Sequence, residues 1–279
     1  MTGRVFIVHD RWRPHPLAWI HRLEARSIAG ELAAAGVDAR LLRFDAGTVA
    51  RMAGERLLLR LSDPVMLQAT HALTDASIRY MGPRAAVMER CYDKYEASRI
   101  ASAAGVASPR TALGCDAAPE TFPAILKPRR GSDSIGVRIL RRGPVPPRAR
   151  DDRHIVQPLV HGSEITIGVL QGTVGDPLRI LLPQGVPFSF ARKYILRPRM
   201  VPLDDARLAA RVRDAAGLVA RTFEVGWAAR IDFICETTSD TLFFLECDVA
   251  PLLGARSAFA ASLAAAGVGR TLQLRLILE

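Results

Sequence analysis

The stretch RIDFICETTSDTLFFLECD, residues 230–248, contains two apolar runs separated by a short polar segment. Both runs are rich in Phe, Ile and Leu, and each has the length of a β-strand. We therefore expect strands at residues 229–235 and 241–247. Each run also carries charged side chains two positions apart, and a charge in an apolar strand needs a partner because burying it alone is costly.

Charged residues at every second position of a strand point to the same face of the sheet. Arg230 and Asp232 have this spacing on the first strand, and Glu246 and Asp248 have it on the second. If the strands pair, three carboxylates converge, and their repulsion favours a bound cation such as Mg²⁺, which prefers oxygen ligands. The alternatives are a salt bridge between Arg230 and Asp232 and solvent-facing acids at the other two positions.

A second chemical pattern is KPRRGSDSIG, residues 127–136, which follows the apolar run FPAIL. A strand that ends at Lys127 would bring its ammonium to a Gly/Ser-rich turn, and a second strand would follow at residues 136–140. Backbone N–H groups of such a turn bind phosphate, and a lysine bridges phosphate oxygens. An ordinary β-hairpin with a long loop is the alternative. The segment has neither the GKS or GKT signature nor the following helix of a Walker A loop.

The rest of the chain has the periodicity of a mixed α/β protein. An apolar run at residues 5–9, a helix over 16–35 and a strand over 37–44 form a βαβ opening typical of a Rossmann-like layer, without a GxGxxG turn. Further strands are expected at residues 57–61, 154–160 and 164–170. Further helices are expected at residues 64–79, 93–105, 204–223 and 257–266, and Asp93 and Glu96 have the spacing of a capping box at the start of the second of these. Residues 143–153 are expected to form an exposed loop.

The positive charge of the chain comes almost entirely from arginine. The net charge is +10, but only three of the 38 basic side chains are lysine, namely Lys94, Lys127 and Lys193. A lysine reaches a phosphate oxygen as a compact point charge, whereas an arginine presents a planar fork. The arginines are scattered, and aromatic residues make up only 6% of the chain, so we expect no nucleic-acid partner.

The lengths of the apolar runs and the spacing of the cysteines bear on the location of the protein. No apolar run reaches the roughly 20 residues that a membrane-spanning helix needs, so we expect no membrane partner. The four cysteines form no CxxC pair, which favours reduced thiols in a cytoplasmic protein.

From about Tyr80 to Gly267 these motifs occur in the order seen in the ATP-grasp superfamily, and the chain most resembles its D-alanine–D-alanine ligase branch. The resemblance implies an α/β (α+β) ATP-grasp fold. It places a Rossmann-like N-terminal domain at residues 1–83, a central ATP-grasp subdomain at 84–163 and a C-terminal subdomain with the metal site at 164–279. The two α+β subdomains would sandwich ATP.

The resemblance also implies which residues bind ATP. Asp93-Lys94 is similar to the Asp-Lys pair of the family, Lys127 to its second ATP lysine, and Lys193 to the lysine that reaches the terminal phosphate. All three lysines therefore fall where the family uses a lysine. The remaining ATP positions implied are Ser134 and Gly136 over the phosphates, Gln157 (usually Glu in the family), Leu159 and Val160 at the adenine, and Glu164 at the ribose.

The reaction chemistry is implied in the same way. Arg230-Ile-Asp232-Phe resembles the RxDF motif, whose arginine acts with Lys193 on the reacting groups and whose aspartate binds magnesium. Glu246 and Asp248 resemble the other metal ligands, although the family has Asn where Asp248 stands. The resemblance implies two Mg²⁺ ions, with Mn²⁺ as a substitute. Tyr194 and Ser257 fall at substrate-binding positions.

Two segments depart from the branch. Pro251-Leu252-Leu253-Gly254 stands in place of Pro-Gly-Met-Thr, so Leu252 replaces a glycine that lets the backbone approach a substrate carboxylate. Residues 9–15, HDRWRPH, replace a Gly-Gly-x-Ser-x-Glu signature. The basic side chains of this segment either hold an acidic substrate or are surface charge. Both departures concern substrate pockets, so the resemblance supports the ATP chemistry more than D-alanine as the substrate.

The expected function is that of a Mg-ATP-dependent, ADP-forming carboxylate–amine ligase that works through an acyl phosphate on small molecules. One alternative is a ligase of another ATP-grasp branch that modifies a peptide, a sugar or a secondary metabolite. Another is a nucleotide-binding regulator without catalysis. The expected partners are the carboxylate and amine substrates. The resemblance also implies a possible homodimer, because many members of the family are dimers. The irregular segment 183–200 suits a lid.

Overall fold

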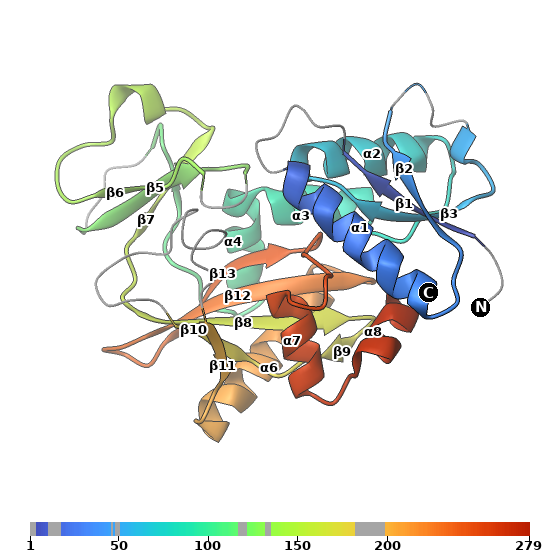
Figure 1. Ribbon diagram of the computed structural model, residues 1–279. Helices are drawn as coiled ribbons and strands as arrows, with labels where there is room; N and C mark the ends of the chain where they lie inside the picture. Colours follow the sequence, from blue (N-terminus) through green and yellow to red (C-terminus); the bar gives the residue numbers. More distant parts are fainter. Residues whose placement is uncertain are drawn as a thin grey trace.

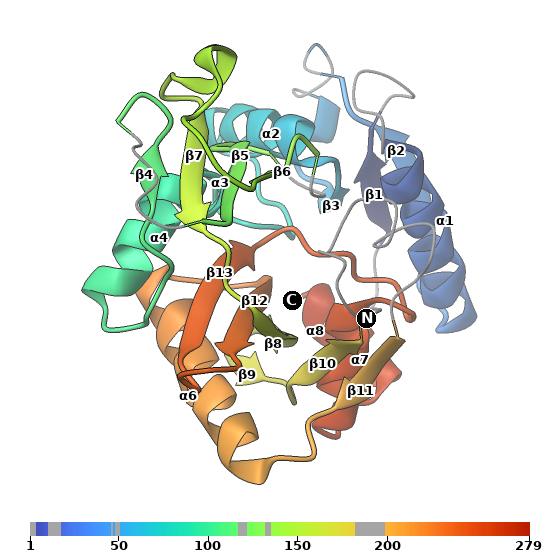
Figure 2. The same cartoon turned by 90° about the vertical axis from the view of Figure 1, so that its left-hand side faces the viewer.

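The computed structural model describes residues 4–10, 18–45, 47, 51–116, 122–131, 135–181 and 199–279. Within these residues three β-sheets and the helices beside them surround a common centre (Figures 1 and 2). The mixed α/β class expected from the sequence is confirmed. Each sheet supplies a different part of the candidate site.

The first sheet belongs to an N-terminal α/β layer. Its three strands are parallel in the order β2-β1-β3, which confirms the predicted βαβ opening. Helix α1 packs on this sheet, and α2 packs on α3. The bounds are β1 Val5–His9, α1 Ala18–Ala34, β2 Ala39–Arg43, β3 Arg56–Arg60, α2 Asp63–Asp75 and α3 Ala85–Tyr92.

The second sheet is small and antiparallel, in the order β4-β7-β5-β6. Its strands are β4 Ala112–Leu113, β5 Ala124–Pro128, β6 Arg138–Leu140 and β7 His154–Pro158. The predicted exposed loop at 143–153 is partly wrong: it contains a short 3-10 helix, Pro147–Ala149, and Val145 and Ala149 are 1% and 3% exposed. These two side chains turn inward because the small sheet has few other residues to form its core.

The third sheet is the largest and follows the order β11-β10-β8-β12-β13, with β9 paired to β8. The pairing on which the expected carboxylate cluster depends is present: β12 and β13 are antiparallel, with Arg230 opposite Asp248 and Asp232 opposite Glu246. The strand bounds are β8 Gly162–Leu170, β9 Thr173–Val174, β10 Leu178–Leu181, β11 Arg199–Pro202, β12 Ala228–Glu236 and β13 Leu242–Asp248.

The two faces of this sheet have different roles. Ile167 and Ile231 point to one face and are fully buried with the apolar side of α6. The alternation of strand side chains sends Thr166, Arg230 and Asp232 to the other face. The remaining helices are α4 Lys94–Ala103, α6 Ala206–Thr222, α7 Ala258–Ala265 and α8 Arg270–Ile277, of which α8 has no counterpart among the sequence predictions.

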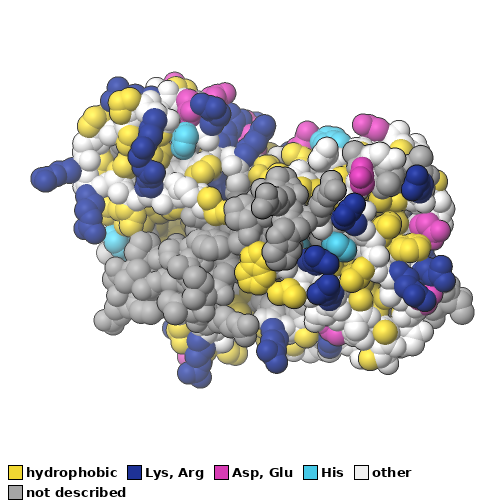
Figure 3. Space-filling model, turned by 45° about the horizontal axis from the view of Figure 1, so that its top comes forward, with side chains coloured by type: hydrophobic (Ala, Val, Ile, Leu, Met, Phe, Trp, Pro, Cys, Tyr) yellow, Lys and Arg dark blue, Asp and Glu magenta, His cyan; other side chains and the backbone are white. Residues whose placement is uncertain are grey.

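The surface agrees with the scattered arginines of the sequence. On the face drawn in Figure 3, the Lys and Arg side chains stand in separate groups and form no continuous stripe. Among the described residues, no helix combines the length and the apolar character that spanning a membrane requires.

Candidate active site

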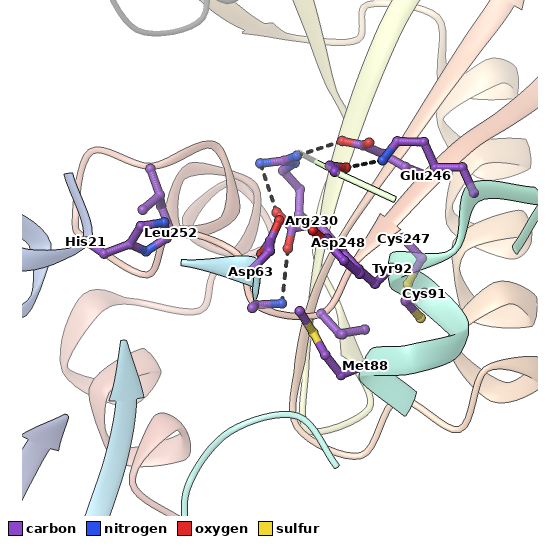
Figure 4. A pocket seen from close by; sticks show the side chains of 14 residues that line it. His21, Asp63, Met88, Cys91, Tyr92, Arg230, Glu246, Cys247, Asp248 and Leu252 are labelled. Carbon is purple, nitrogen blue, oxygen red and sulfur yellow. Dashed lines mark hydrogen bonds and ion pairs between the residues drawn. The ribbon is translucent and has the colours of Figure 1, made fainter. Parts of the chain in front are cut away.

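Four charged side chains of β12 and β13 form a cluster on the polar face of the large sheet. Arg230 Nη2 donates to Asp232 Oδ2 at 3.0 Å and to Glu246 Oε1 at 3.2 Å. Arg230 Nη1 lies 3.4 Å from Asp248 Oδ2. Figure 4 shows the guanidinium between Glu246 and Asp248. The convergence predicted from the spacing is therefore confirmed.

The cluster is partly buried and carries an excess of negative charge, since one guanidinium faces three carboxylates. Burial alone would lower the pKa of Arg230, but the carboxylates of Asp232, Asp248 and Glu246 outweigh it and hold that pKa well above its usual value. Thr166 Oγ1 donates to Asp232 Oδ1 at 2.7 Å. Because one guanidinium faces three carboxylates, the site attracts a further cation.

Two of the three lysines meet at the turn that follows β5. Lys94 Nζ donates to the carbonyl oxygen of Gly131. Burial and, to a smaller extent, the neighbouring Lys94 ammonium lower the pKa of Lys127 to about 8, although the Glu246 carboxylate acts in the opposite direction. Both ammonium groups thus lie near each other and near the acidic cluster. An anion with several oxygens, such as a polyphosphate, could bind both.

Asp93 fixes the position of Lys94. Its carboxylate accepts hydrogen bonds from the backbone N–H groups of Tyr95 at 3.1 Å and Glu96 at 3.2 Å, so Asp93 caps the helix as predicted. The reciprocal half of the predicted capping box is wrong, because the Asp93 N–H donates to the Glu89 carbonyl and the Glu96 carboxylate accepts from Arg99 instead. The Asp93 carboxylate also accepts from Arg129 Nε at 2.8 Å. The start of α4 is therefore tied to the turn after β5, and Lys94 has little freedom to leave it.

Gly136 closes the same turn. Its φ of 78° lies in the left-handed region, and a Cβ atom there would stand 2.9 Å from Cγ of Pro128. Glycine is the residue that adopts this conformation without strain. The tight packing keeps the two strands of the turn close together beside Lys127.

The expected adenine region contains a buried polar chain. Thr111 Oγ1 donates to the Pro109 carbonyl at 2.8 Å and accepts from Gln157 Nε2 at 2.7 Å. One of the two N–H donors of the Gln157 amide is thereby used, and its oxygen stays an acceptor. The Leu159 N–H donates to the Pro123 carbonyl at 2.9 Å. Val160 follows in the short connection from β7 to β8.

Glu164 and Ser257 lie on two other elements of the candidate site. Glu164 is on β8, opposite Ile234, on the same face as Thr166. Ser257 caps α7, since its Oγ accepts from the Ala260 N–H at 3.1 Å. The Ser257 hydroxyl hydrogen can still be donated to a substrate. Ser134, Lys193, Tyr194, the basic residues Arg11, Arg13 and His15, and residues 183–198 of the expected lid lie outside the described residues.

The pocket beside the cluster contains residues that the sequence analysis missed. Lys94, Gly131, Arg230, Glu246 and Asp248 line one part of it. The N-terminal layer and α3 contribute His21, Asp63 and Tyr92. Burial raises the pKa of Tyr92 to about 12, helped by the Asp63 carboxylate. These residues carry no local motif, because only the tertiary fold brings them to the cluster.

The cluster can also be judged as a metal site. Within the described part of the chain, no group of three or more His, Cys, Asp or Glu side chains is arranged to hold a metal ion; the three acids instead surround Arg230. Their chemistry nevertheless fits Mg²⁺, because they offer hard oxygen donors with a net negative charge beside two ammonium groups suited to phosphate.

Comparison with known proteins gives a consistent result. Residues 115–278 match the family model described as D-ala D-ala ligase C-terminus. A D-alanine–D-alanine ligase of Syntrophotalea carbinolica is 28% identical over 63% of this chain and 61% of its own length. One of Stutzerimonas stutzeri is 27% identical over 81% of this chain and 78% of its own length. The first relative is thus matched over less than two thirds of its length.

Solved structures show the same fold at low sequence identity. A D-alanine–D-alanine ligase of Bacillus anthracis superposes with a TM-score of 0.82 at 16% identity, covering 99% of this chain and 96% of the other. A D-Ala:D-Ser ligase of Enterococcus faecalis gives a TM-score of 0.78 at 15% identity, covering 100% and 99% of the two chains.

Proposed function

Because this chain belongs to the D-alanine–D-alanine ligase family, whose members are ADP-forming C–N ligases of the ATP-grasp fold, we propose that it joins a small carboxylate to an amine at the cost of ATP. The observation that carries the proposal is that Lys94 lines one pocket with Arg230, Glu246 and Asp248, and that Lys127 lies close enough to Lys94 and Glu246 for both charges to shift its pKa. A phosphate chain and a reacting carboxylate would be neighbours there.

The first step transfers the terminal phosphoryl group. A carboxylate oxygen of the substrate attacks the γ-phosphorus, the bond to the β,γ-bridging oxygen breaks, and ADP leaves. Lys94 and Lys127 bind the phosphate oxygens, and Lys193 completes the set. Charge stabilisation and positioning dominate such transfers, and these lysines supply both.

Asp232, Glu246 and Asp248 would hold Mg²⁺, which supplies charge neutralisation and orientation of the phosphates. We propose two ions with Mn²⁺ as a substitute. Thr166 keeps the Asp232 carboxylate in place through its hydrogen bond. Gln157, Leu159, Val160 and Glu164 would bind the nucleoside, and Ser134 and Gly136 would contact the phosphates.

The second step forms the amide. The amine nitrogen attacks the carbonyl carbon of the acyl phosphate, the bond from carbon to the phosphate oxygen breaks, phosphate leaves, and the nitrogen loses a proton. Arg230 stabilises the oxyanion that develops at this carbon. Tyr194 and Ser257 contact the substrates. A homodimer stays a prediction, as do the domain limits at residues 83 and 163.

The substrate is proposed by class only. Leu252 lines the pocket and occupies space beside His21, so the acceptor pocket differs from one with glycine at that position. We therefore propose a small amino acid, dipeptide or amino-group-bearing metabolite, with D-alanine as one candidate among them.

Phosphate release from Mg-ATP, measured against a panel of amino acids, dipeptides and carboxylated metabolites, tests the proposal. Lys127→Ala and Asp232→Asn should each lower amine-dependent release at least 100-fold, since each removes charge stabilisation of the transition state. Asp214→Asn, an exposed acid on α6, is the matched control and should behave like the unmodified protein.

The remaining outcomes separate the alternatives. Mg-ATP binding without stimulation by any panel member would point to a nucleotide-binding regulator or to a substrate outside the panel. A protein that does not bind Mg-ATP in a direct titration would rule out the ligase.

A further inference from the structure

A buried ion pair in the N-terminal layer contacts the loop that follows the acidic strand β13. Glu24 on α1 and Arg60 at the end of β3 lie 2.7 Å apart, and their side chains are 6% and 0% exposed. Neither residue lines the pocket around Arg230. Neither has a part in the ligase chemistry proposed above.

The pair holds the backbone of residues 251–254 at three points. Glu24 Oε1 accepts from the N–H of Leu253 and from the N–H of Gly254, the latter at 3.0 Å. Arg60 Nη2 donates to the Pro251 carbonyl at 2.7 Å. The loop comes from the C-terminal half of the chain, about 190 residues after Arg60 and about 230 after Glu24.

Additional contacts fix the same loop. Arg270 Nη1 donates to the Leu253 carbonyl at 2.8 Å, and Arg270 Nε bonds to Glu31 on α1 at 2.6 Å. The Leu253 side chain is fully buried between α1 and the large sheet. Both the backbone and one side chain of the loop are therefore anchored to the N-terminal layer.

This anchoring determines where Leu252 points. Leu252 lies between the held groups of Pro251 and Leu253, so its backbone has little freedom. Its side chain lines the pocket with His21 and Arg230, and Figure 4 shows Leu252 and His21 at the end of the pocket away from Glu246. Leu252 thus forms the pocket wall opposite the phosphate end.

Burying two charges is costly and contributes little net stability unless every group has a partner. Glu24 meets this condition: Arg60 Nε and Nη2 donate at 2.9 and 2.7 Å, in addition to the two backbone N–H groups. Two apolar side chains of the same volume could not form the hydrogen bonds that Glu24 and Arg60 make to the backbone of the loop. The geometry is therefore suited to holding one loop conformation.

We propose that Glu24 and Arg60 are positioning residues that set the Leu252 wall, and that this wall selects the substrate by the size of its side chain. This inference rests on the proposed ligase function for its substrate part only. The anchoring of the loop can be tested without an enzyme assay.

Amide hydrogen exchange of residues 249–257 provides that test. Glu24→Gln should increase exchange in this segment, because the amide oxygen is a weaker acceptor than the carboxylate. Exchange in β12 should not change. The double variant Glu24→Gln, Arg60→Met leaves no unpaired buried charge, and it keeps the test valid if the single variant does not fold. The matched control is Asp38→Asn, Arg40→Met, an exposed pair of the same layer, with side chains 43% and 64% exposed.

The panel assay tests the selection. With glycine and D-leucine as probes, Leu252→Gly should raise the ratio of kcat/KM for D-leucine over glycine at least tenfold, with the KM for ATP within twofold. In the Glu24 variants the KM for the amino acid should rise more than the KM for ATP. Unchanged exchange in residues 249–257 would refute the anchoring, and an unchanged ratio for Leu252→Gly would refute the selection. A protein that binds no ATP would refute the ligase function and with it the substrate selection by Leu252. The anchoring of the loop by Glu24 and Arg60 would then still be decided by the hydrogen-exchange result.

Discussion

Lys127, a proposed phosphate ligand, is a residue whose charge should respond to nucleotide binding. In the free protein, burial and the neighbouring Lys94 hold its pKa at about 8. A bound phosphate chain favours the protonated form and raises that pKa. Above about pH 8 binding must therefore take up a proton, so the affinity for Mg-ATP should fall by up to about tenfold per pH unit, whereas below pH 8 it should be flat. Calorimetric titration at a series of pH values measures this.

Lys127→Arg is the control for this pH dependence, because a guanidinium stays charged throughout the range. Its affinity for Mg-ATP should not depend on pH in the window where that of the unmodified protein falls. The same pH profile in both proteins would show that another group is responsible.

At the residue scale, sequence patterns identified neighbours in the chain but not partners across the fold. The i, i+2 spacing predicted that Arg230 and Asp232 share a face, and the Asp93 cap followed from its position before a helix. Glu24 carried no such signal, because its partners lie 36 and 229 residues away. Arg60 was the one available hint of a buried ion pair, because it is a charged residue inside the apolar run 57–61.

At the scale of elements, Gly162 determines how β8 can pair with β12. It lies opposite Glu236, and a Cβ atom there would stand 2.0 Å from the Cys235 carbonyl oxygen. Gly162→Ala should therefore force the strands apart and destabilise the protein by about 1–3 kcal/mol, as measured by urea denaturation. Gly30→Ala, in the middle of α1 with open space around it, should instead stabilise by about 0.5–1 kcal/mol. Equal effects of the two changes would contradict this account.

Strands were easier to predict than their connections. The apolar runs of β1, β8, β12 and β13 stood out because buried strands are short and nearly continuous in apolar residues. The inward turn of Val145 and Ala149 was missed, since the surrounding prolines and charges are typical of an exposed loop. Helix α8 was missed because it begins after a glycine without a side-chain cap.

At the scale of the whole molecule, the predicted domains share a core. One continuous cluster joins Val8 of the N-terminal layer, Met88 of α3 and Ile231 of the large sheet. This sharing follows from long-range packing: α3 and α4 lie against β13 although the sequence assigns them to the central part. The small sheet differs, because Ala124, Leu126, Val145, Ala149 and Val156 form a separate cluster.

The small sheet should therefore open independently of the rest. Leu126 is 3% exposed, and Leu126→Ala should cost about 2–5 kcal/mol. We expect faster amide hydrogen exchange across residues 122–158 and little change in β8 and β12, because the larger core does not depend on Leu126. Ile231→Ala, in the shared core, should instead speed exchange in the N-terminal sheet and the large sheet. If ATP binds at the proposed site, saturating Mg-ATP should slow the opening of the small sheet, since the ligand would contact Lys127 and Gln157 only when that sheet is closed. If Leu126→Ala unfolds all three sheets together, the small sheet is part of one cooperative unit with them.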